Sequence, residues 1–410
     1  MLGREKAKGI NHEGQIRMTI KVSKLSVGLV PDRFAQYRHA AFKAMSDEQA
    51  NGYKLAIYAD SVEDKKGVVL LDSKFCNGDY DNGGVCWYRL KNISIKNICF
   101  WQRGLVSVAM KSEHDVMVYW GDAYRISTWF ASIISKLRGK KVVYWTHGVY
   151  GNESFFKMAF RMTFYRMAHA ILLYGRFGRN NLVRQGYPEA QAFVINNSLD
   201  CEQQNRIYSQ SSDEAAAYRK MNYDANDNVL VFVGRLEPPK KLHMLMEALS
   251  QLNDSEQVFK LLVIGDGTEK TKLELLVSNL GLAERVCFYG ACYDNEILAP
   301  MLMMADICVS PGEVGLTAMH SLIYGTPVVT HNKFSEQMPE FEAIEDAVSG
   351  GFYDYGSIAS LVSKIGRTVK LINEGVICPD SCRASILARY TPSFQEVEFG
   401  KMLKYLNEER

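Results

Sequence analysis

The chain has 410 residues, of which 47% are hydrophobic and 23% charged. This composition is typical of a globular protein with about two to three domains, and it excludes disordered, collagen-like and coiled-coil chains. The net charge is only +2, but it is unevenly distributed. Up to Asn197 there are 29 basic and 16 acidic residues, which leaves 19 basic and 30 acidic residues for the rest of the chain. The front half is therefore basic and the back half acidic.

Neither a membrane span nor a signal peptide is expected. No apolar run reaches the roughly 18 residues that suggest a spanning helix, and residues 1–21 are polar. The nine cysteines include no Cys-x-x-Cys pair and lie mostly in apolar, strand-like runs. This pattern favours reduced cysteines and a cytosolic location.

The apolar residues predict two series of alternating strands and helices. In the front half, strands are expected at 25–30, 53–60, 115–120 and 140–145, and helices at 31–45, 126–137 and 154–170. In the back half, strands are expected at 228–234, 259–267, 285–290, 306–311 and 326–330, with helices after residue 241, up to residue 280 and from residue 317. The polar break near Asn197 separates the series. Two doubly wound α/β units with parallel sheets are therefore predicted, with ligands beyond the carboxyl ends of the strands.

The first candidate site follows the strand at 228–234. Gly234 ends this strand, Arg235 comes next, and Lys240 and Lys241 stand at the start of a helix. Two cations beside a helix N-terminus suit a diphosphate, because Arg235 can bind phosphate oxygens bidentately and Lys240 can act as a point charge. The alternative interpretation of these residues is a basic turn that is exposed to solvent and binds no ligand.

The second candidate site follows the strand at 306–311. Gly312 and Gly315 allow a close backbone approach to a ligand, and a helix begins near Leu316 or Thr317. His320 lies one turn further along this helix. The pattern predicts a phosphate-binding helix N-terminus, although a single histidine on a helix is more commonly structural.

These segments resemble the retaining glycosyltransferases of family 4, in particular a subgroup that assembles bacterial polysaccharides. The resemblance rests on Gly234-Arg235-Leu236, Lys240, Gly315-Leu316, Tyr324-Gly325-Thr326-Pro327-Val328-Val329, Asn196-Asn197-Ser198-Leu199-Asp200, Gly265-Asp266-Gly267 and Thr146-His147-Gly148. Order and spacing agree from about residue 142 to residue 353.

The resemblance implies the GT-B fold, with two facing Rossmann-like domains. It implies an N-terminal extension at 1–22, an acceptor domain at 23–197, a nucleotide-sugar donor domain at 198–390, and a final helix at 391–410 that crosses back to the first domain. The implied donor is a UDP- or GDP-linked sugar, and no metal cofactor is implied.

The resemblance also implies roles for single residues. Arg235 and Lys240 would neutralise the leaving diphosphate, which carries the charge that develops during transfer. Backbone groups at Gly315 and Leu316 would donate to the diphosphate, and His147 would lie beside the donor sugar. Gly234, Gly312 and Thr317 complete the implied donor site.

The chain departs from the family at two positions. The family usually has two glutamates separated by seven residues, and the corresponding positions here are Gly312 and His320. Glu313 is one residue out of register, so we expect it to reach the donor sugar by a different loop path. His320 could replace a carboxylate at the nucleotide ribose. An inactive enzyme is the alternative.

Two other patterns imitate known sites. Asp79-Tyr80-Asp81 resembles a metal-binding triplet but lies in a Gly- and Asn-rich segment, where these residues favour turns. Gly265-x-Gly267 resembles the start of a dinucleotide-binding fingerprint, but Lys270 replaces its third glycine. Neither a metal site nor hydride transfer is predicted.

The basic half suggests an anionic partner. Its surplus charge could attract a membrane with a lipid-linked acceptor or a phosphorylated acceptor, whereas no nucleic-acid recognition motif is present. Arg33, Tyr37 and Arg38 follow the first strand and could contact an acceptor pyrophosphate, or they could simply begin an exposed helix. The aromatic and basic stretch 155–167 favours a core helix over one lying on a membrane.

We therefore expect a hexosyltransferase-type enzyme, peripheral on the cytoplasmic face of the inner membrane, that transfers a sugar to a glycan or lipid-linked acceptor in surface-polysaccharide assembly. One alternative is a sugar-nucleotide epimerase on the same scaffold. Another is a non-catalytic subunit that binds nucleotides or glycans. The sequence does not identify the sugar, the nucleoside or the acceptor.

Overall fold

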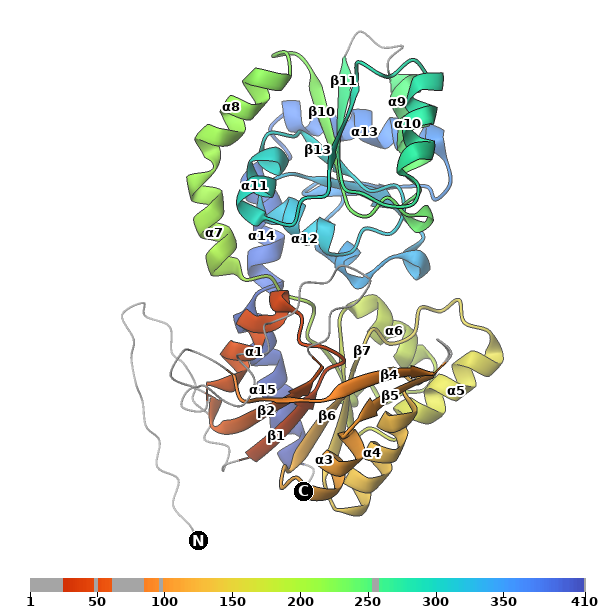
Figure 1. Ribbon diagram of the computed structural model, residues 1–410, viewed down its shortest axis with the longest axis vertical. Coiled ribbons are helices and arrows are strands. Elements are labelled where there is room, and N and C mark those ends of the chain that lie inside the picture. Colours follow the sequence, from red (N-terminus) through yellow and green to blue (C-terminus); the bar gives the residue numbers. More distant parts are fainter. Residues whose placement is uncertain (1–24, 48–50, 61–84, 96–98, 253–257, 409–410) are drawn as a thin grey trace. The chain divides into compact units, whose positions relative to one another are not determined.

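The computed structural model describes residues 25–47, 51–60, 85–95, 99–252 and 258–408 (Figure 1). The described chain divides into two compact units. Unit 1 contains the described residues up to Trp145, Thr163–Ile171, and the chain from Phe399 onward. Unit 2 contains Thr146–Met162 and Leu172–Glu398.

The front half of the chain forms a seven-stranded sheet with the order β3-β2-β1-β6-β7-β8-β9. Its strands are β1 (Leu25–Val30), β2 (Tyr53–Ala59), β3 (Trp87–Arg89), β6 (Val116–Trp120), β7 (Lys141–Thr146), β8 (Ala170–Leu173) and β9 (Ala192–Val194). Strand β1 pairs in parallel with β2 on one side and with β6 on the other. The accompanying helices are α1 (His39–Ser46), α3 (Leu105–Lys111), α4 (Ile126–Leu137), α5 (Phe155–Tyr165) and α6 (Arg176–Arg184).

The back half forms a six-stranded sheet with the order β12-β11-β10-β13-β14-β15. Its strands are β10 (Asn228–Val233), β11 (Phe259–Ile264), β12 (Val286–Gly290), β13 (Ile307–Val309), β14 (Val328–His331) and β15 (Gly350–Tyr353). Their helices are α7 (Cys201–Gln210), α8 (Ser212–Asn222), α9 (Leu242–Leu252), α10 (Lys270–Asn279), α11 (Asn295–Met303), α12 (Leu316–Ile323), α13 (Ile358–Asn373) and α14 (Pro379–Arg389). The last helix, α15 (Pro392–Glu408), belongs to unit 1 from Phe399 onward.

This second sheet has the doubly wound order, in which the first strand, β10, lies between the second and the fourth. The order of strands reverses between β10 and β13, because β10 pairs in parallel with both β11 and β13. Ligands of such sheets bind beyond the carboxyl ends of the strands at this reversal. The segments after β10 and β13 are therefore the first place to look for a site.

The core of unit 2 covers both faces of this sheet. Val229 and Val231 of β10 belong to one buried cluster together with Met319 of α12. The alternate residues Leu230 and Phe232 belong to a second cluster, which contains residues of α9. Because successive side chains of a strand point to opposite faces, β10 is apolar throughout, and the predicted burial on both sides is confirmed.

The predicted α/β class, with parallel sheets in two domains, is confirmed. The sequence analysis missed an antiparallel hairpin of β4 (Lys91–Ile95) and β5 (Cys99–Arg103). It was also wrong about the start of α5. Met158 and Met162 are buried, but Phe155 and Phe156 are 80% and 83% exposed, so the first turn of this helix is not in a core.

Candidate active site

The segment after β10 makes a sharp turn before α9. Gly234 has φ +152°, a conformation that favours glycine. The next residue, Arg235, is exposed, and its side chain makes no hydrogen bond or ion pair within the described part of the chain. A short 3₁₀ helix, Pro238–Lys240, then leads to Lys241, whose φ is +50°. This turn presents Arg235 to solvent beside the carboxyl end of β10.

Lys240 is held by the neighbouring segment after β13. Its Nζ donates a hydrogen bond to the carbonyl oxygen of Glu313 at 2.8 Å and lies 3.4 Å from the carboxylate of the same residue. The Lys240 side chain is 15% exposed. Burial lowers its pKa, whereas the Glu313 carboxylate acts in the opposite direction. The structure thus brings together two residues that were predicted separately.

The backbones of the two segments also touch at Gly312. A Cβ atom at this position would overlap the carbonyl oxygen of Pro239 and lie 2.7 Å from Cα of Lys240. The Gly312 amide donates to the Lys240 carbonyl at 3.0 Å. Glycine is therefore required here for the packing of one segment on the other.

Gln337 fixes the segment after β13, and the sequence analysis missed this residue. Its side chain accepts a hydrogen bond from the Val314 amide at 2.9 Å and donates to Thr330 Oγ1 at 2.8 Å and to the His331 carbonyl at 3.1 Å. Gln337 is 2% exposed. No sequence pattern distinguishes this glutamine from an exposed one, because its partners come from separate segments.

Helix α12 begins at Leu316, as predicted, and its N-terminus has no side-chain cap among the described residues. Gly315 precedes it with φ +56° and ψ −150°, a region open essentially to glycine alone. Thr317 Oγ1 donates to the Val233 carbonyl at 3.0 Å and fastens the first turn to the end of β10. The first amides of a helix have no intrahelical acceptor, and they attract anions.

His320 lies one turn into α12 and is partly buried. Its Nδ1 atom is buried and has no hydrogen-bond partner within the described chain. Burial lowers the pKa of His320 to about 4, so the ring is neutral at pH 7. A buried nitrogen without a partner costs free energy, and a ligand hydroxyl group could supply the missing hydrogen bond.

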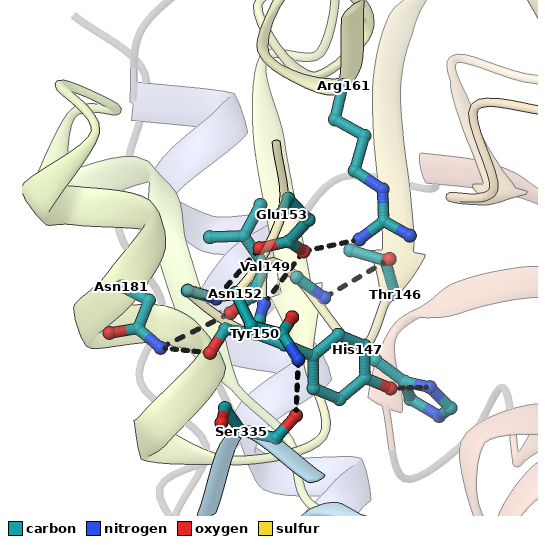
Figure 2. Close-up of polar contacts among 11 residues, drawn as sticks. Thr146, His147, Val149, Tyr150, Asn152, Glu153, Arg161, Asn181 and Ser335 are labelled. Carbon is teal, nitrogen blue, oxygen red and sulfur yellow. Dashed lines mark hydrogen bonds and ion pairs between the residues drawn. The ribbon is translucent and has the colours of Figure 1, made fainter. Parts of the chain in front are cut away.

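The predicted histidine turn follows β7 and belongs to unit 2. Figure 2 shows its polar contacts. The Tyr150 hydroxyl lies 3.2 Å from His147 Nδ1, and the Tyr174 ring packs edge-on against the histidine at 4.8 Å between centroids. Glu153 accepts hydrogen bonds from the Tyr150 amide at 2.9 Å and the Gly151 amide at 2.8 Å. The position of His147 therefore depends on a loop that is closed by Glu153.

Several side chains support this turn. Arg161 of α5 donates to Glu153 at 2.8 Å, and Asn181 of α6 donates to the carbonyl oxygens of Val149 and Tyr150 at 3.4 and 3.3 Å, as Figure 2 shows. Asn152 donates to the Ser335 carbonyl at 3.3 Å. These contacts connect the histidine turn to α5, α6 and the segment after β14.

A small cavity lies beside the histidine turn. Its lining includes His147 and Gln337, so the glutamine that holds the segment after β13 also borders the predicted sugar-side histidine. Glu342 lines the same cavity and caps α6, because its carboxylate accepts from the amides of Arg176 at 2.8 Å and Phe177 at 2.6 Å. The N-terminus of α6 is thus already occupied by a carboxylate.

The predicted acceptor residues lie in unit 1, near the carboxyl ends of β1 and β6. Arg38 Nε donates to the Tyr37 hydroxyl at 2.9 Å, and the guanidinium stacks 4.8 Å from the ring centroid of Trp120. Arg33 pairs through its backbone with Asp60 after β2. The strand order of this sheet reverses at β1 and β6, so Arg38 lies where a doubly wound sheet binds ligands.

The remaining predictions concern a metal site and membrane-spanning helices. Asp79 and Asp81 lie outside the described residues. Within the described ranges, no group of three or more histidine, cysteine, aspartate or glutamate side chains could hold a metal ion. No described helix has both the length and the apolar composition needed to cross a bilayer.

The sequence is similar to known glycosyltransferases in its back half. Residues 214–372 match the family Glycosyl transferases group 1. A 2-deoxystreptamine glucosyltransferase of Streptomyces kanamyceticus is 33% identical over 106 residues, which are 25% of this chain and 27% of that protein. A D-inositol 3-phosphate glycosyltransferase of Segniliparus rotundus is 29% identical over 178 residues, 40% of this chain and 38% of that protein. The chain thus matches less than half the length of these relatives.

Solved structures match almost the whole chain. The crystal structure of Anabaena HepE in complex with UDP has a TM-score of 0.67 and 17% identity and covers 93% of this chain and 99% of its own. The lipopolysaccharide outer core galactosyltransferase WaaB has a TM-score of 0.64 and 14% identity, with coverage of 92% and 99%. The protein therefore has the predicted GT-B fold, and its residues 214–372 are similar to the group 1 glycosyl transferases.

Proposed function

We propose that the protein is a retaining glycosyltransferase of the family 4 type, which transfers a sugar from a nucleoside-diphosphate sugar to a glycan or lipid-linked acceptor. The match of residues 214–372 supports this proposal, because it includes β10, α9, β13 and α12 and hence the predicted donor site. The relatives named above are glycosyltransferases, and HepE was crystallised with UDP.

One observation carries the proposal. Lys240, the free Arg235 side chain and the uncapped N-terminus of α12 all lie at the reversal between β10 and β13. This arrangement offers two cations and open backbone amides to one anionic group. A diphosphate is the ligand that best fits this chemistry, and its charge increases as the bond to the sugar breaks.

The chain's own residues would act mainly on the leaving group. Arg235 and Lys240 would stabilise the diphosphate oxygens, together with the backbone amides of Leu316 and Thr317. The acceptor hydroxyl would attack the anomeric carbon on the face that the diphosphate leaves, and its proton would pass to the leaving group. Such a reaction retains the anomeric configuration and needs no nucleophile from the protein.

Other residues would position the sugar and the nucleoside. Glu313 lies beside Lys240 at 3.4 Å, and we propose that its carboxylate binds a sugar hydroxyl. His320 would bond the ribose through its buried nitrogen, and His147 would contact the sugar from the turn after β7. We propose a UDP- or GDP-linked donor, and catalysis without a metal cofactor.

We propose surface-polysaccharide assembly at the cytoplasmic face of the inner membrane as the process served. The basic character of unit 1 supports an anionic acceptor or membrane. Its described residues include 16 lysines and arginines against 7 aspartates and glutamates. In α5, Phe155 and Phe156 are exposed beside Lys157, as in segments that contact a lipid surface. Arg38, stacked on Trp120, would receive an acceptor phosphate.

A panel of nucleotide sugars tests the proposal. We expect one UDP- or GDP-sugar to raise the melting temperature, since binding to the folded state stabilises it, and the same donor to be hydrolysed slowly or transferred. Product analysis by NMR should show retention at the anomeric carbon. Interconversion of two nucleotide sugars would instead indicate an epimerase, and binding without turnover a non-catalytic subunit.

A further inference from the structure

Helix α4 of unit 1 exposes an apolar stripe. Ile126, Phe130, Ile133 and Leu137 are 39%, 51%, 47% and 82% exposed. Their spacing of four, three and four residues places them on one side of the helix. We call these four residues the α4 stripe. A surface helix normally buries such a stripe against the core of its own domain.

The opposite side of α4 is polar, and this is the side that faces the core. Ser127, Ser132 and Ser135 are each 0% exposed. Ser135 lies 2.7 Å from the hydroxyl of Tyr119 in β6, and Ser132 accepts from the hydroxyl of Tyr144 in β7 at 2.8 Å. The hydroxyl groups thus hold the helix to the sheet with its apolar side outward.

Hydrogen bonds fix this orientation. Of the stripe residues, Phe130 also packs against Trp101 of β5, with 6.1 Å between the ring centroids. The Gln102 amide of β5 donates to Ser127 Oγ at 3.0 Å, which adds a third attachment from a second sheet. If α4 rotated to bury its stripe, the buried tyrosine hydroxyls and the Gln102 amide would lose their partners, which is costly. The hydrogen bonds of α4 therefore keep these four apolar side chains on the surface of unit 1.

Cations border the α4 stripe at the end of the helix. Lys136 lies in the last turn of α4 and Arg138 directly follows the helix, and both residues are exposed. Arg138 Nη1 donates to the carbonyl oxygens of Ala109 at 3.1 Å and Ser112 at 2.7 Å, so the end of α3 lies against the end of α4. Met110, which follows Ala109 in α3, is 49% exposed.

The charge of this region is mostly positive. Lys111, which follows Met110, is exposed. Two acids lie nearby: the Glu113 carboxylate is 3.4 Å from Arg138, and Asp115 interacts with Lys140. Apolar side chains bordered by unbalanced cations suit the boundary between lipid headgroups and acyl chains, where the headgroups are anionic.

We propose that the α4 stripe, with Met110 and Lys111, lies on an anionic lipid surface. This proposal deepens the membrane partner given under the proposed function and rests on it, because it states which surface makes the contact. A second copy of the chain is the competing occupant. Two copies joined symmetrically through this surface would bring Lys111, Lys136 and Arg138 together with few acids to balance them, which disfavours it.

Vesicle binding tests the proposal. Full-length protein would be sedimented with vesicles of phosphatidylcholine containing phosphatidylglycerol and with vesicles of phosphatidylcholine alone. We expect binding to the anionic vesicles that weakens with added salt. The variant Phe130→Glu/Leu137→Glu should bind at least about tenfold more weakly, because each apolar side chain lost from an interface weakens binding by about that factor.

The control is Leu275→Glu, which introduces one such negative charge at a 63% exposed leucine of α10 in unit 2. This variant should bind vesicles like the unchanged protein. The double variant should melt only slightly lower than the unchanged protein, because Phe130 is half exposed and packs against Trp101. All three proteins should show the same stabilisation by the nucleotide sugar. Lys111→Ala should weaken anionic binding by about fivefold, as expected for the loss of one cation near such a surface.

Two results would overturn the proposal. If Phe130→Glu/Leu137→Glu bound anionic vesicles as well as the unchanged protein, another surface would make the contact, although the membrane partner would stand. If the unchanged protein ignored vesicles but dimerised in sedimentation velocity, and the variant stayed monomeric, the α4 stripe would be a protein interface. Donor binding and transfer in solution are measured separately, so either result leaves the proposed sugar transfer in place.

Discussion

Lys240 donates a hydrogen bond from Nζ to the main-chain carbonyl of Glu313 at 2.8 Å and lies 3.4 Å from the carboxylate of that residue. The contact joins the segment after β10 to the segment after β13. It also means that, without a ligand, the charge of Lys240 is partly balanced by Glu313. A diphosphate would have to compete with this carboxylate for the lysine.

Removal of either cation should reduce sugar transfer strongly. We expect Lys240→Ala and Arg235→Ala each to lower kcat by about 100-fold or more, because one lost charge-assisted contact to a leaving group costs on the order of 3 kcal/mol. Steady-state kinetics with the identified donor measures this. Lys272→Ala is the control, since Lys272 is 77% exposed and pairs with Glu269 at the start of its own helix. Near-normal kcat in the first two variants would rule out the diphosphate site.

Glu313→Gln should separate donor binding from transfer. The substitution keeps the shape of the side chain but removes the charge that competes for Lys240, so we expect the free nucleoside diphosphate to bind several-fold more tightly. We expect kcat to fall at least about tenfold, because the glutamine binds a sugar hydroxyl less strongly than the carboxylate does. Calorimetry and steady-state kinetics measure the two effects. If the affinity for the diphosphate and kcat fell by the same factor, Glu313 would not compete with the diphosphate for Lys240.

Gly315→Ala should destabilise the start of α12. The φ of +56° and ψ of −150° at this position strain any residue with a side chain, at a cost of about 1–3 kcal/mol. Chemical denaturation measures the change. The control is Gly366→Ala within α13, where a Cβ would meet no atom within 4 Å; it should raise stability by about 0.5–1 kcal/mol. If both variants were equally stable, Gly315 would not be strained.

The buried ring of His320 should make stability fall with acid. Its pKa is lowered from 6.5 to about 4 in the folded protein, so between these values the unfolded chain binds a proton that the folded protein does not. The free energy of unfolding should therefore decrease as the pH falls from 6.5 to 4, by on the order of 1 kcal/mol per pH unit from this residue.

Urea denaturation at several pH values, with His320→Asn for comparison, measures this slope. The variant should lose less stability over the same pH range, although its stability at pH 7 can differ for other reasons. His114 and His331 also have pKa values lowered to about 4 by burial, so they contribute equally to both proteins. Identical slopes would show that folding leaves the pKa of His320 unchanged.

A chelator should leave sugar transfer unchanged. The proposed reaction uses Arg235 and Lys240 to balance the diphosphate, and a metal ion would duplicate this role. Initial rates before and after dialysis against EDTA, with added magnesium as the reverse test, measure the effect. A strict requirement for magnesium would direct attention back to Asp79 and Asp81.

The sequence predicts the strands of the second sheet well, because β10 and β11 are apolar at nearly every position. It also placed the start of α12, since Gly315 interrupts one element and the apolar spacing of a helix follows. Local patterns of this kind depend on neighbours in the chain. The hairpin of β4 and β5 was missed because its strands lack a regular alternation of apolar and polar residues.

The supports of the site could not be predicted in the same way. Gln337 acts through partners at Val314 and Thr330, and Glu153 through backbone amides of its own loop and Arg161. These contacts exist only once separate segments have packed. The orientation of α4 likewise depends on contacts between separate segments, since Ser132 and Ser135 bond to tyrosine hydroxyls of β7 and β6.

The carboxylate of Glu342 on the N-terminus of α6 has a consequence for selectivity within unit 2. This helix end carries partial positive charge and would otherwise attract the same anions as α12. Glu342 occupies its amides as a permanent internal counter-ion. The partial positive charge at the N-terminus of α6 is therefore already neutralised, whereas the N-terminus of α12 remains available to a phosphate. In this mostly acidic part of the chain, two features direct the anionic ligand to α12: the N-terminus of α6 is blocked by Glu342, and the N-terminus of α12 is not capped by a described side chain.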